Sequence, residues 1–408
     1  MNILFTTPIL EHPPAGGPQL RIENSIKALS RVGKLYIISR ASRLMIGGQA
    51  AEDFYRSYAQ DFRYAPSCVG HCSNRYIRKA QRVFGGVTGL DAERDCAYIL
   101  RCVDEWKIDV VWLGYGNISF PLIKKLRAAR PNLKLVCDTD SIWSRFVLRE
   151  LPYIKNSLRK LLVARRGRAK EIEERKWVEL CDVTTGVSEV DCAYYRTLTK
   201  DVHKVQQFSN VIDLDTYSKT SPEAEALHKP YIYLAGTFGH ANSPMDKAAR
   251  WMLDEVMPLV RKSLPDLHFY IVGSGSDMTL GHETNANVTV TGNLKSVLPY
   301  LCYADVSVVP LKFESGTRFK ILEAAACDIP IVSTILGAEG IPAENEKHLL
   351  LADSAEDFAQ AIVKLVNDRA YAKQLAKSCK EMVYKEFSID TLEKEAKDIL
   401  EYIAKCQK

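Results

Sequence analysis

Short apolar runs alternate with amphipathic segments along most of the chain. The first run, Asn2–Thr7, leads into a loop rich in proline and glycine, then a helix-spaced segment, Arg21–Arg31, and a second run, Lys34–Ser39. Continuous apolar runs of this length are typical of parallel strands buried on both faces, and the amphipathic segment is typical of a crossover helix. The chain therefore opens with a strand–loop–helix–strand unit, whereas residues 41–107 show no pattern that we can assign.

The same alternation continues and predicts an α/β fold with two facing Rossmann-like domains, each a doubly wound parallel sheet. Further strands are predicted at Asp109–Leu113, Lys134–Asp138, Asp182–Val187, Val205–Phe208, Tyr231–Leu234, His268–Val272, Val288–Thr291, Asp305–Phe313 and Ile329–Thr334. Helices are predicted at Pro121–Ala129, residues 154–180, Ser188–Tyr195, Pro244–Leu264, Ser296–Tyr303 and Arg318–Cys327, and in the tail from 355. We expect a first domain over residues 1–212, a polar linker over 213–230, a second domain over 231–390 and a C-terminal helix over 391–408, with a return of that helix to the first domain as one alternative.

The stretch from Val308 to Gly340 carries the least usual feature of the sequence. Its predicted helix opens with Arg318 and Lys320, although a helix N-terminus bears partial positive charge and favours acidic side chains. An anion bound there would reverse the penalty, because free N–H groups, the helix dipole and both cations would converge on it. Phosphate is the obvious candidate. The alternative is a solvated Arg318 and a Lys320 that pairs with Glu323 three residues further on.

The composition is that of an ordinary globular chain. It has 408 residues, of which 47% are hydrophobic and 26% charged, and its net charge of +5 is too small to indicate nucleic acid, although it suits anionic substrates. No apolar run reaches about 18 residues, and the N-terminus lacks the basic region of a signal peptide. Eleven cysteines, mostly in apolar surroundings, fit a reducing compartment. We therefore expect a cytoplasmic protein.

Two further clusters have more than one interpretation. Cys68, His71 and Cys72 are spaced like metal ligands, but no second pair of ligands lies near them, so we predict no metal site. Basic residues gather at 75–82 and in the first half of the helix 154–180. They would suit peripheral contact with the inner face of a membrane, or they form a solvated surface.

Glycines and aspartates follow several predicted strands. Gly16 and Gly17 follow the first strand, as in nucleotide-binding α/β folds, but the G-x-G-x-x-G fingerprint of dinucleotide-binding proteins is missing. Asp138 and Asp140 follow a strand end, which is where α/β sheets bind their ligands. The alternative is that these aspartates cap the next helix.

Taken in order, these features resemble the GT-B glycosyltransferases of the glycosyltransferase family 4 type, a retaining, nucleotide-sugar-dependent group. The resemblance covers nearly the full length and is strongest over residues 231–340. It rests on YIYLAGTFGHANSPMDKAARWM, LHFYIVGSG, the stretch from VTVTGN to IPIVST, SNVIDLDTY at the linker, and GGPQLR and GVSEVD in the first domain. Glu323 matches the second glutamate of the family's E-x7-E motif, but Ser315 stands at the first, so the chain resembles an S-G-T-R-x-K variant.

The resemblance implies a role for each matched residue. Arg318, Lys320 and Glu323 would be the catalytic set, in which the two cations hold the diphosphate and Glu323 accepts the ribose hydroxyls. The donor-binding residues would be Gly16, Gly17, Gly236, Thr237, Gly275, Asn293, Leu294, Ser315, Gly316 and Thr317. Asp138 and Asp140 would lie on the acceptor side. GT-B enzymes generally stabilise the leaving diphosphate with cations and helix N-termini, so the resemblance implies neither metal nor cofactor.

The expected activity is transfer of a hexose-type sugar from a nucleotide sugar to a sugar, lipid or small-molecule acceptor, as in polysaccharide biosynthesis. Because Ser315 replaces the glutamate that usually contacts the transferred sugar, a catalytically inactive GT-B binding protein is one alternative. A GT-B nucleotide-sugar epimerase is another, but it would need acid and base side chains in the cleft, and none of the eight histidines pairs obviously with the motif.

Overall fold

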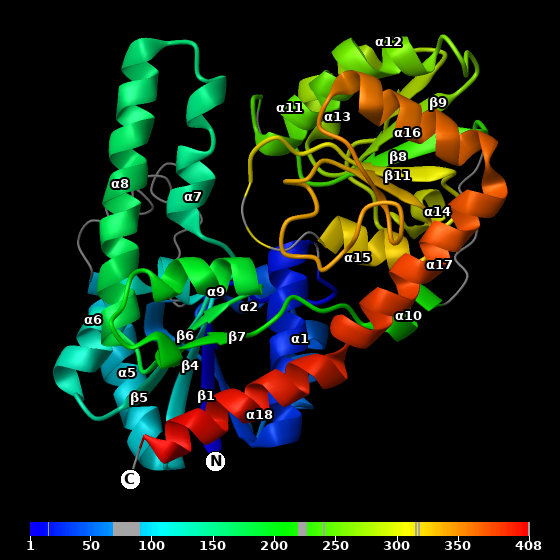
Figure 1. Cartoon of the computed structure of the whole chain (residues 1–408). Coiled ribbons are helices and arrows are strands. Elements are labelled where there is room, and N and C mark those ends of the chain that lie inside the picture. The colour runs from blue at the N-terminus through cyan, green and yellow to red at the C-terminus, as the bar shows by residue number, and fades with distance from the viewer. Residues whose placement is uncertain are drawn as a thin grey trace. The chain divides into compact units, whose positions relative to one another are not determined.

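The computed structural model divides into two compact units, each built on a parallel sheet (Figure 1). It describes residues 1–14, 16–67, 90–218, 227–239, 241–314, 316 and 319–406. Unit 1 comprises Met1–Asn210 with Ile389–Lys408, and unit 2 comprises Val211–Ser388. The predicted fold class, two Rossmann-like α/β domains, is confirmed.

The described part of unit 1 contains a seven-stranded parallel sheet flanked by helices. From edge to edge its strands are β3 (Asp61–Tyr64), β2 (Lys34–Ser39), β1 (Asn2–Thr7), β4 (Val110–Gly114), β5 (Lys134–Asp138), β6 (Val183–Gly186) and β7 (Val205–Gln207). Its helices are α1 (Gly17–Val32), α2 (Arg43–Ile46), α3 (Gln49–Arg56), α5 (Leu90–Trp106), α6 (Phe120–Ala129), α7 (Trp143–Leu148), α8 (Ser157–Leu180), α9 (Glu189–Arg196) and α18 (Ile389–Lys405), with short 3₁₀ turns η2 (Gly116–Ile118), η3 (Leu151–Tyr153) and η4 (Val202–Lys204).

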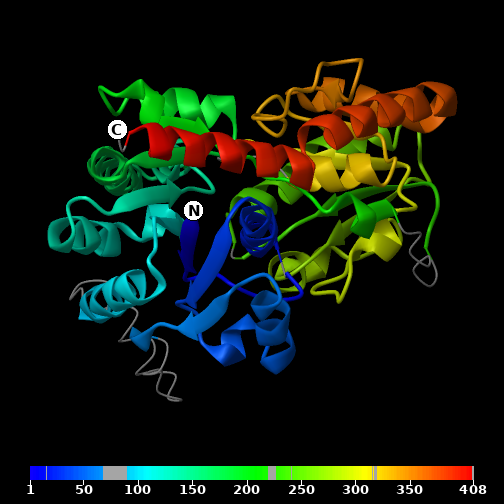
Figure 2. The same cartoon turned by 90° about the horizontal axis from the view of Figure 1, so that it is seen from below.

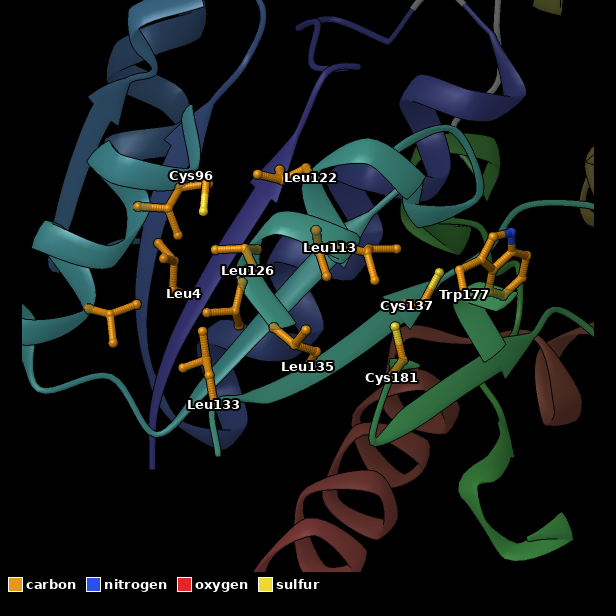
Figure 3. Packing of buried hydrophobic residues seen from close by; sticks show 14 of the residues in the cluster. Leu4, Cys96, Leu113, Leu122, Leu126, Leu133, Leu135, Cys137, Trp177 and Cys181 are labelled. Carbon is orange, nitrogen blue, oxygen red and sulfur yellow. The ribbon is translucent and has the colours of Figure 1, made fainter. Parts of the chain in front are cut away.

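The core of unit 1 explains the apolar runs of the sequence. In β1 the residues Ile3, Leu4 and Phe5 are fully buried, because both faces of the sheet are covered by helices. On one face Leu4, with Leu113 and Leu135 of the adjoining strands, packs against helix side chains (Figure 3). Those side chains include Leu122 and Leu126 of α6 and Trp177 of α8.

The C-terminal helix α18 packs on α1 within unit 1 (Figure 2). Arg31 of α1 forms an ion pair with Asp390 at 3.1 Å. Glu395 accepts hydrogen bonds from the backbone N–H and the hydroxyl of Ser209, both at 2.7 Å. These contacts hold the C-terminal helix against α1 and against Ser209, near the end of the first segment of unit 1.

The described part of unit 2 contains a six-stranded parallel sheet. From edge to edge its strands are β10 (Val288–Val290), β9 (His268–Val272), β8 (Tyr231–Ala235), β11 (Val306–Val309), β12 (Ile331–Ser333) and β13 (Leu350–Leu351). Its helices are α10 (Leu214–Ser218), α11 (Pro244–Trp251), α12 (Met257–Val260), α13 (Ser276–Leu280), α14 (Leu298–Leu301), α15 (Phe319–Ala326), α16 (Ala355–Asn367) and α17 (Arg369–Glu386), with a π-helical turn η5 (Met252–Val256) and a 3₁₀ turn η6 (Gly281–Glu283).

Two features of unit 2 differ from the sequence prediction. The helix predicted over Pro244–Leu264 is confirmed as far as Val260, where it ends four residues early, and it contains a π-helical turn over Met252–Val256. Pro258 accounts for the π-helical turn, since it has no N–H to donate and its ring crowds the preceding turn. In addition, α10 forms inside the stretch predicted as a polar linker.

Candidate functional site

The order of strands in unit 2 marks where a ligand site is expected. The chain builds β8, β9 and β10 outward on one side and then returns to add β11 on the other side of β8. In open α/β sheets, ligands bind beyond the carboxyl ends of the strands at this reversal point. The relevant segments are therefore the loops that follow β8 and β11.

The loops after β8 and β9 pack backbone against backbone. Gly273 has a φ of +124°, and a Cβ atom there would lie 2.2 Å from the carbonyl oxygen of Gly236. The Gly236 N–H donates to Val272 O at 3.0 Å, and the Phe238 N–H donates to Ser274 O at 2.9 Å. No side chain fits between the two loops at this point, so the glycines are a steric requirement.

The loop after β10 joins the same surface. Gly273 donates its N–H to Gly292 O at 3.1 Å, and Gly292 donates its own to the Ser276 hydroxyl at 3.1 Å. Asn293 and Leu294 follow directly, the first exposed and the second half-buried. The structure thus groups the predicted positions Gly236, Thr237, Gly275, Asn293 and Leu294 at the carboxyl ends of β8, β9 and β10.

Lys320 brings a cation to this surface from α15. A Cβ atom on Gly236 would lie 3.0 Å from Cε of Lys320, so the lysine side chain lies directly over the glycine after β8. Gly316, in the turn before α15, has a φ of +88°. The helix itself is held by its buried rear face, which includes Ile321, Leu322 and Ala325.

Glu323 lies one turn after Lys320. Its Oε1 accepts a hydrogen bond from the Tyr217 hydroxyl at 2.8 Å, and no ion pair among the described residues joins it to Lys320. Burial raises the pKa of the Glu323 carboxyl, against the opposing effects of the Tyr217 hydrogen bond and the Lys320 charge. A partly buried carboxylate that faces a ligand site can accept hydrogen bonds from hydroxyl groups of a ligand.

Two residues near this site were missed in the sequence. Tyr217 lies on α10, and the only signal for it was the end of the SNVIDLDTY segment, which carried no assigned role. Lys247 of α11 lies with its Nζ 5.1 Å from the centre of the Phe313 ring, in the loop after β11. A lysine on an amphipathic helix gave no sequence signal that distinguished it from a surface lysine.

Unit 1 places the glycine pair at its own reversal point, between β1 and β4. Gly17 is the first residue of α1, and Gly16 precedes it in an extended conformation. The first turn of α1 contains no acidic residue, so its N–H groups and the positive end of its dipole are not neutralised by the helix's own side chains.

The two aspartates predicted on the acceptor side have different surroundings. Asp138 is fully buried, accepts a hydrogen bond from Thr185 Oγ1 at 3.0 Å and forms an ion pair with Arg21. Arg21 also donates to the Asn210 side chain at 2.8 Å and to Phe208 O at 3.0 Å. Asp138 is therefore the centre of a buried network that joins β5 and α1 to residues Phe208 and Asn210.

Asp140 is only half-buried. It accepts a hydrogen bond from Asn117 Nδ2 at 2.6 Å, and burial raises the pKa of its carboxyl, with Tyr115 and Asn117 opposing the shift. Tyr115 itself has a φ of +59° in the loop after β4. Neither aspartate caps the next helix, because α7 follows Ile142 without a side-chain cap bond.

Several predicted positions lie outside the described residues. They are Ser315, Thr317 and Arg318, which precede α15 in the sequence, the Cys68–His71–Cys72 cluster and the basic cluster at 75–82. Within the described ranges, no group of three or more His, Cys, Asp or Glu side chains is arranged to hold a metal ion. In the same ranges, no helix has both the length and the apolar character of a membrane span.

Comparison with known proteins gives a family match that lies within unit 2. Residues 229–368 match the family model described as "Glycosyl transferases group 1", so this part of the chain is similar to that family. No curated protein matches the sequence.

Three solved structures illustrate the similarity of the whole chain to known proteins. Sucrose-phosphate synthase from Thermosynechococcus elongatus has 16% identity and a TM-score of 0.68, with 100% of each chain covered. HepE from Anabaena, in complex with UDP-glucose, has 13% identity and a TM-score of 0.63, with 98% of this chain and 99% of that one covered. TarM from S. aureus, in a complex that contains UDP, has 10% identity and a TM-score of 0.63 at the same coverage. At these identities the likeness establishes the fold, which is GT-B.

Proposed function

We propose that the chain is a retaining glycosyltransferase of the family 4 type, which moves a sugar from a nucleoside-diphosphate sugar to an acceptor hydroxyl. The observation that carries this proposal is the placement of Lys320 over Gly236 at the reversal point of the unit 2 sheet, with Glu323 one turn further along α15. One cation and one carboxylate at this spacing match the diphosphate and the ribose of such a donor.

Lys320 and Arg318 would stabilise the negative charge that develops on the leaving diphosphate. The N–H groups of Ser315, Gly316 and Thr317, which precede α15 in the sequence, would add hydrogen bonds to the same oxygens. Gly16 and Gly17 of unit 1 would let backbone approach the donor phosphates. No metal ion or other cofactor enters this scheme.

Glu323 would accept the two ribose hydroxyls, with Tyr217 holding its carboxylate in position. Gly275, Asn293 and Leu294 would contact the nucleotide base, largely through backbone atoms, and Gly236 and Thr237 would line the phosphate side. The joined backbone of the loops after β8, β9 and β10 supports this assignment, because it offers N–H and C=O groups in a fixed arrangement.

On the acceptor side we favour Asp140 over Asp138. The Asp138 carboxylate already neutralises Arg21 inside unit 1, so its role is structural. Asp140 is half-buried at the carboxyl edge of the sheet and lies beside Asn117. The described cysteines are free thiols and most are buried, which supports a cytoplasmic enzyme.

A direct test is release of nucleoside diphosphate from a panel of nucleotide sugars, with and without sugar and lipid acceptors. Lys320→Ala should reduce turnover by about 10²–10³-fold, the usual effect of removing one group that stabilises the developing charge. Lys373→Ala, which removes an exposed lysine of α17 in the same unit, is the matched control and should not change turnover.

Unchanged turnover in Lys320→Ala would contradict the phosphate assignment.

The presence of Ser315 in place of the first motif glutamate supports a second candidate, a GT-B protein that binds nucleotide sugars without transferring them. That candidate predicts a thermal shift with nucleotide sugars and no release of nucleoside diphosphate from any of them.

A further inference from the structure

Helix α8 of unit 1 has two different faces. One face packs against α7 and the core of the unit, as the side-by-side course of the two helices shows (Figure 1). The contact with α7 is close at Gly167, where a Cβ atom would lie 2.4 Å from Leu148 Cδ2. Further along the helix Trp177 and Val178 are buried in the core. This face accounts for the position of the helix.

The opposite face is apolar and exposed. Leu158, Leu161 and Leu162 are 68%, 50% and 57% exposed, and Ile172 is 57% exposed. At 3.6 residues per turn, these positions and Arg165 project on one side of the helix, away from the packed side. Below, these five residues are called the outer face of α8. The solvent side of a surface helix normally carries polar residues, so the leucines are unexpected there.

Cations flank this apolar surface. Between residues 155 and 170 the chain has no acidic residue, and its basic residues are Lys155, Arg159, Lys160, Arg165, Arg166, Arg168 and Lys170. Arg159 pairs with Glu150 at 3.1 Å, and Lys170 pairs with Glu173 at 3.0 Å. The other basic residues of α8 form no ion pair with a described residue. Their positive charge is therefore available to an external partner.

We propose that the outer face of α8 docks unit 1 on the surface of a lipid bilayer that contains anionic phospholipids. The leucines would enter the boundary between headgroups and acyl chains, where their transfer from water is favourable. The long basic side chains on either side would reach the phosphates while their methylene stems cover apolar surface. A solvated basic helix, the simpler interpretation, would not need leucines on its solvent side.

A bilayer fits this pattern better than a protein partner does. The centres of protein interfaces are enriched in aromatic side chains, whereas the apolar side chains of the outer face of α8 are all aliphatic. Its charges also lie along both sides of the apolar surface, which suits an extended layer of negative charge. Docking depends on unit 1 alone, and so it goes beyond the proposed transfer reaction.

The test is co-sedimentation of the full chain with vesicles of phosphatidylcholine alone or of phosphatidylcholine and phosphatidylglycerol in equal parts. The wild type should bind the anionic vesicles, less strongly as salt rises, and should not bind the neutral ones. The triple variant Leu158→Gln, Leu161→Gln, Leu162→Gln should need at least about tenfold more anionic lipid than the wild type for half-maximal binding. Because these side chains are at least half exposed, the variant should unfold at the wild-type temperature.

A charge variant and two controls complete the test. Arg165→Gln, Arg166→Gln, Arg168→Gln should bind about tenfold more weakly and should lose most of the salt dependence. One control replaces three other exposed apolar residues of unit 1, Leu44→Gln, Met45→Gln and Val202→Gln. The other replaces three exposed lysines of α17, Lys373→Gln, Lys377→Gln and Lys385→Gln. Both controls should bind like the wild type.

Three results would overturn the proposal. They are equal binding of the leucine variant and the wild type, equal binding of the wild type to neutral and anionic vesicles, and self-association in solution that the leucine variant abolishes while no vesicle binds. The last result would make the outer face of α8 an interface between copies of the chain. Because the assay needs no donor sugar, a chain that binds vesicles without transferring sugar would refute the proposed function and leave the docking in place.

Discussion

Replacement of Glu323 by glutamine removes a charge and keeps the shape of the side chain. The amide oxygen of glutamine can still accept the hydrogen bond from the Tyr217 hydroxyl, which is 2.8 Å from the carboxylate in the wild type. The variant therefore tests the charge on Glu323 rather than the packing of α15. It should affect nucleotide binding and protein stability in opposite directions.

The loss of nucleotide affinity follows from the hydrogen bonds proposed for the ribose. A hydrogen bond to a charged group contributes about 1.5–3 kcal/mol and a neutral one about 0.5–1.5 kcal/mol. The difference is about 1 kcal/mol for each of two hydroxyls, or about 2 kcal/mol together, which corresponds to roughly 30-fold in Kd.

The gain in stability follows from the pKa of Glu323, which burial raises above the ordinary value of 4.5. A carboxyl whose pKa is raised on folding stabilises the fold below its ordinary pKa, and this contribution is lost as pH rises through the folded pKa. At neutral pH the ionised Glu323 therefore costs stability. Glu323→Gln should melt at a higher temperature than the wild type at neutral pH, and the difference should vanish as pH falls toward 4.5.

The assay combines calorimetric titration with UDP, GDP and ADP and thermal melts across pH. Glu381→Gln, which changes an exposed glutamate of α17, is the control and should alter neither quantity. Wild-type affinity in Glu323→Gln for the nucleotide that the wild type binds would refute the ribose assignment. A lower melting temperature for the variant at neutral pH would refute the argument that burial destabilises the charged carboxyl.

Three other substitutions test the surroundings of the site. Tyr217→Phe removes a hydrogen bond that lowers the pKa of Glu323, so the loss of nucleotide affinity on acidification should begin at higher pH; an unchanged pH profile of Kd would contradict this. Asp138→Asn leaves the buried Arg21 without its counter-charge and should cost about 3–5 kcal/mol in denaturant unfolding, whereas a loss of activity without a loss of stability would favour a direct role at the acceptor. Gly273→Ala adds a Cβ atom 2.2 Å from a carbonyl oxygen at a φ of +124° and should weaken nucleotide binding at least about tenfold, as titration would show; wild-type affinity would exclude that loop from the site.

The strands at the centre of each sheet were predictable because both of their faces are buried. The predicted ranges Asn2–Thr7, Lys134–Asp138 and His268–Val272 are the observed β1, β5 and β9. Every residue of β9 is buried, so selection for apolar side chains acts along the strand and leaves the continuous run Phe269–Val272 in the sequence.

The edge of the unit 1 sheet could not be predicted for the opposite reason. In the described sheet the strand β3, Asp61–Tyr64, pairs with β2 alone, and Phe62 is its one buried residue. Its charged residues Asp61 and Arg63 pair with each other at 2.9 Å, and Arg63 also pairs with Glu105 of α5. Such a strand has no apolar run, and its pairing is specified by the neighbouring strand rather than by its own sequence.

At the candidate site, the limits of sequence reasoning come from tertiary contacts. Asp138 ends β5 and Asp140 follows it two residues later, and nothing in the local sequence distinguishes their roles. Only the buried Arg21, more than 100 residues away in sequence, shows that Asp138 is already neutralised. Likewise, Tyr217 lies in a polar segment, and its role depends on the packing of α10 against α15.

The contact between Gly236 and Lys320 joins two sequence signals that had separate explanations. The glycine after β8 suggested a tight loop, and the lysine at the start of α15 suggested an anion at the helix N-terminus. In the structure a Cβ atom at position 236 would lie 3.0 Å from Lys320 Cε, so the absence of a side chain there is what allows the lysine to lie over the end of β8. A cation held against half-buried backbone at this point has little reason to be there for stability, since no acidic side chain among the described residues forms an ion pair with it. An anionic ligand supplies that reason, and it explains both residues at once.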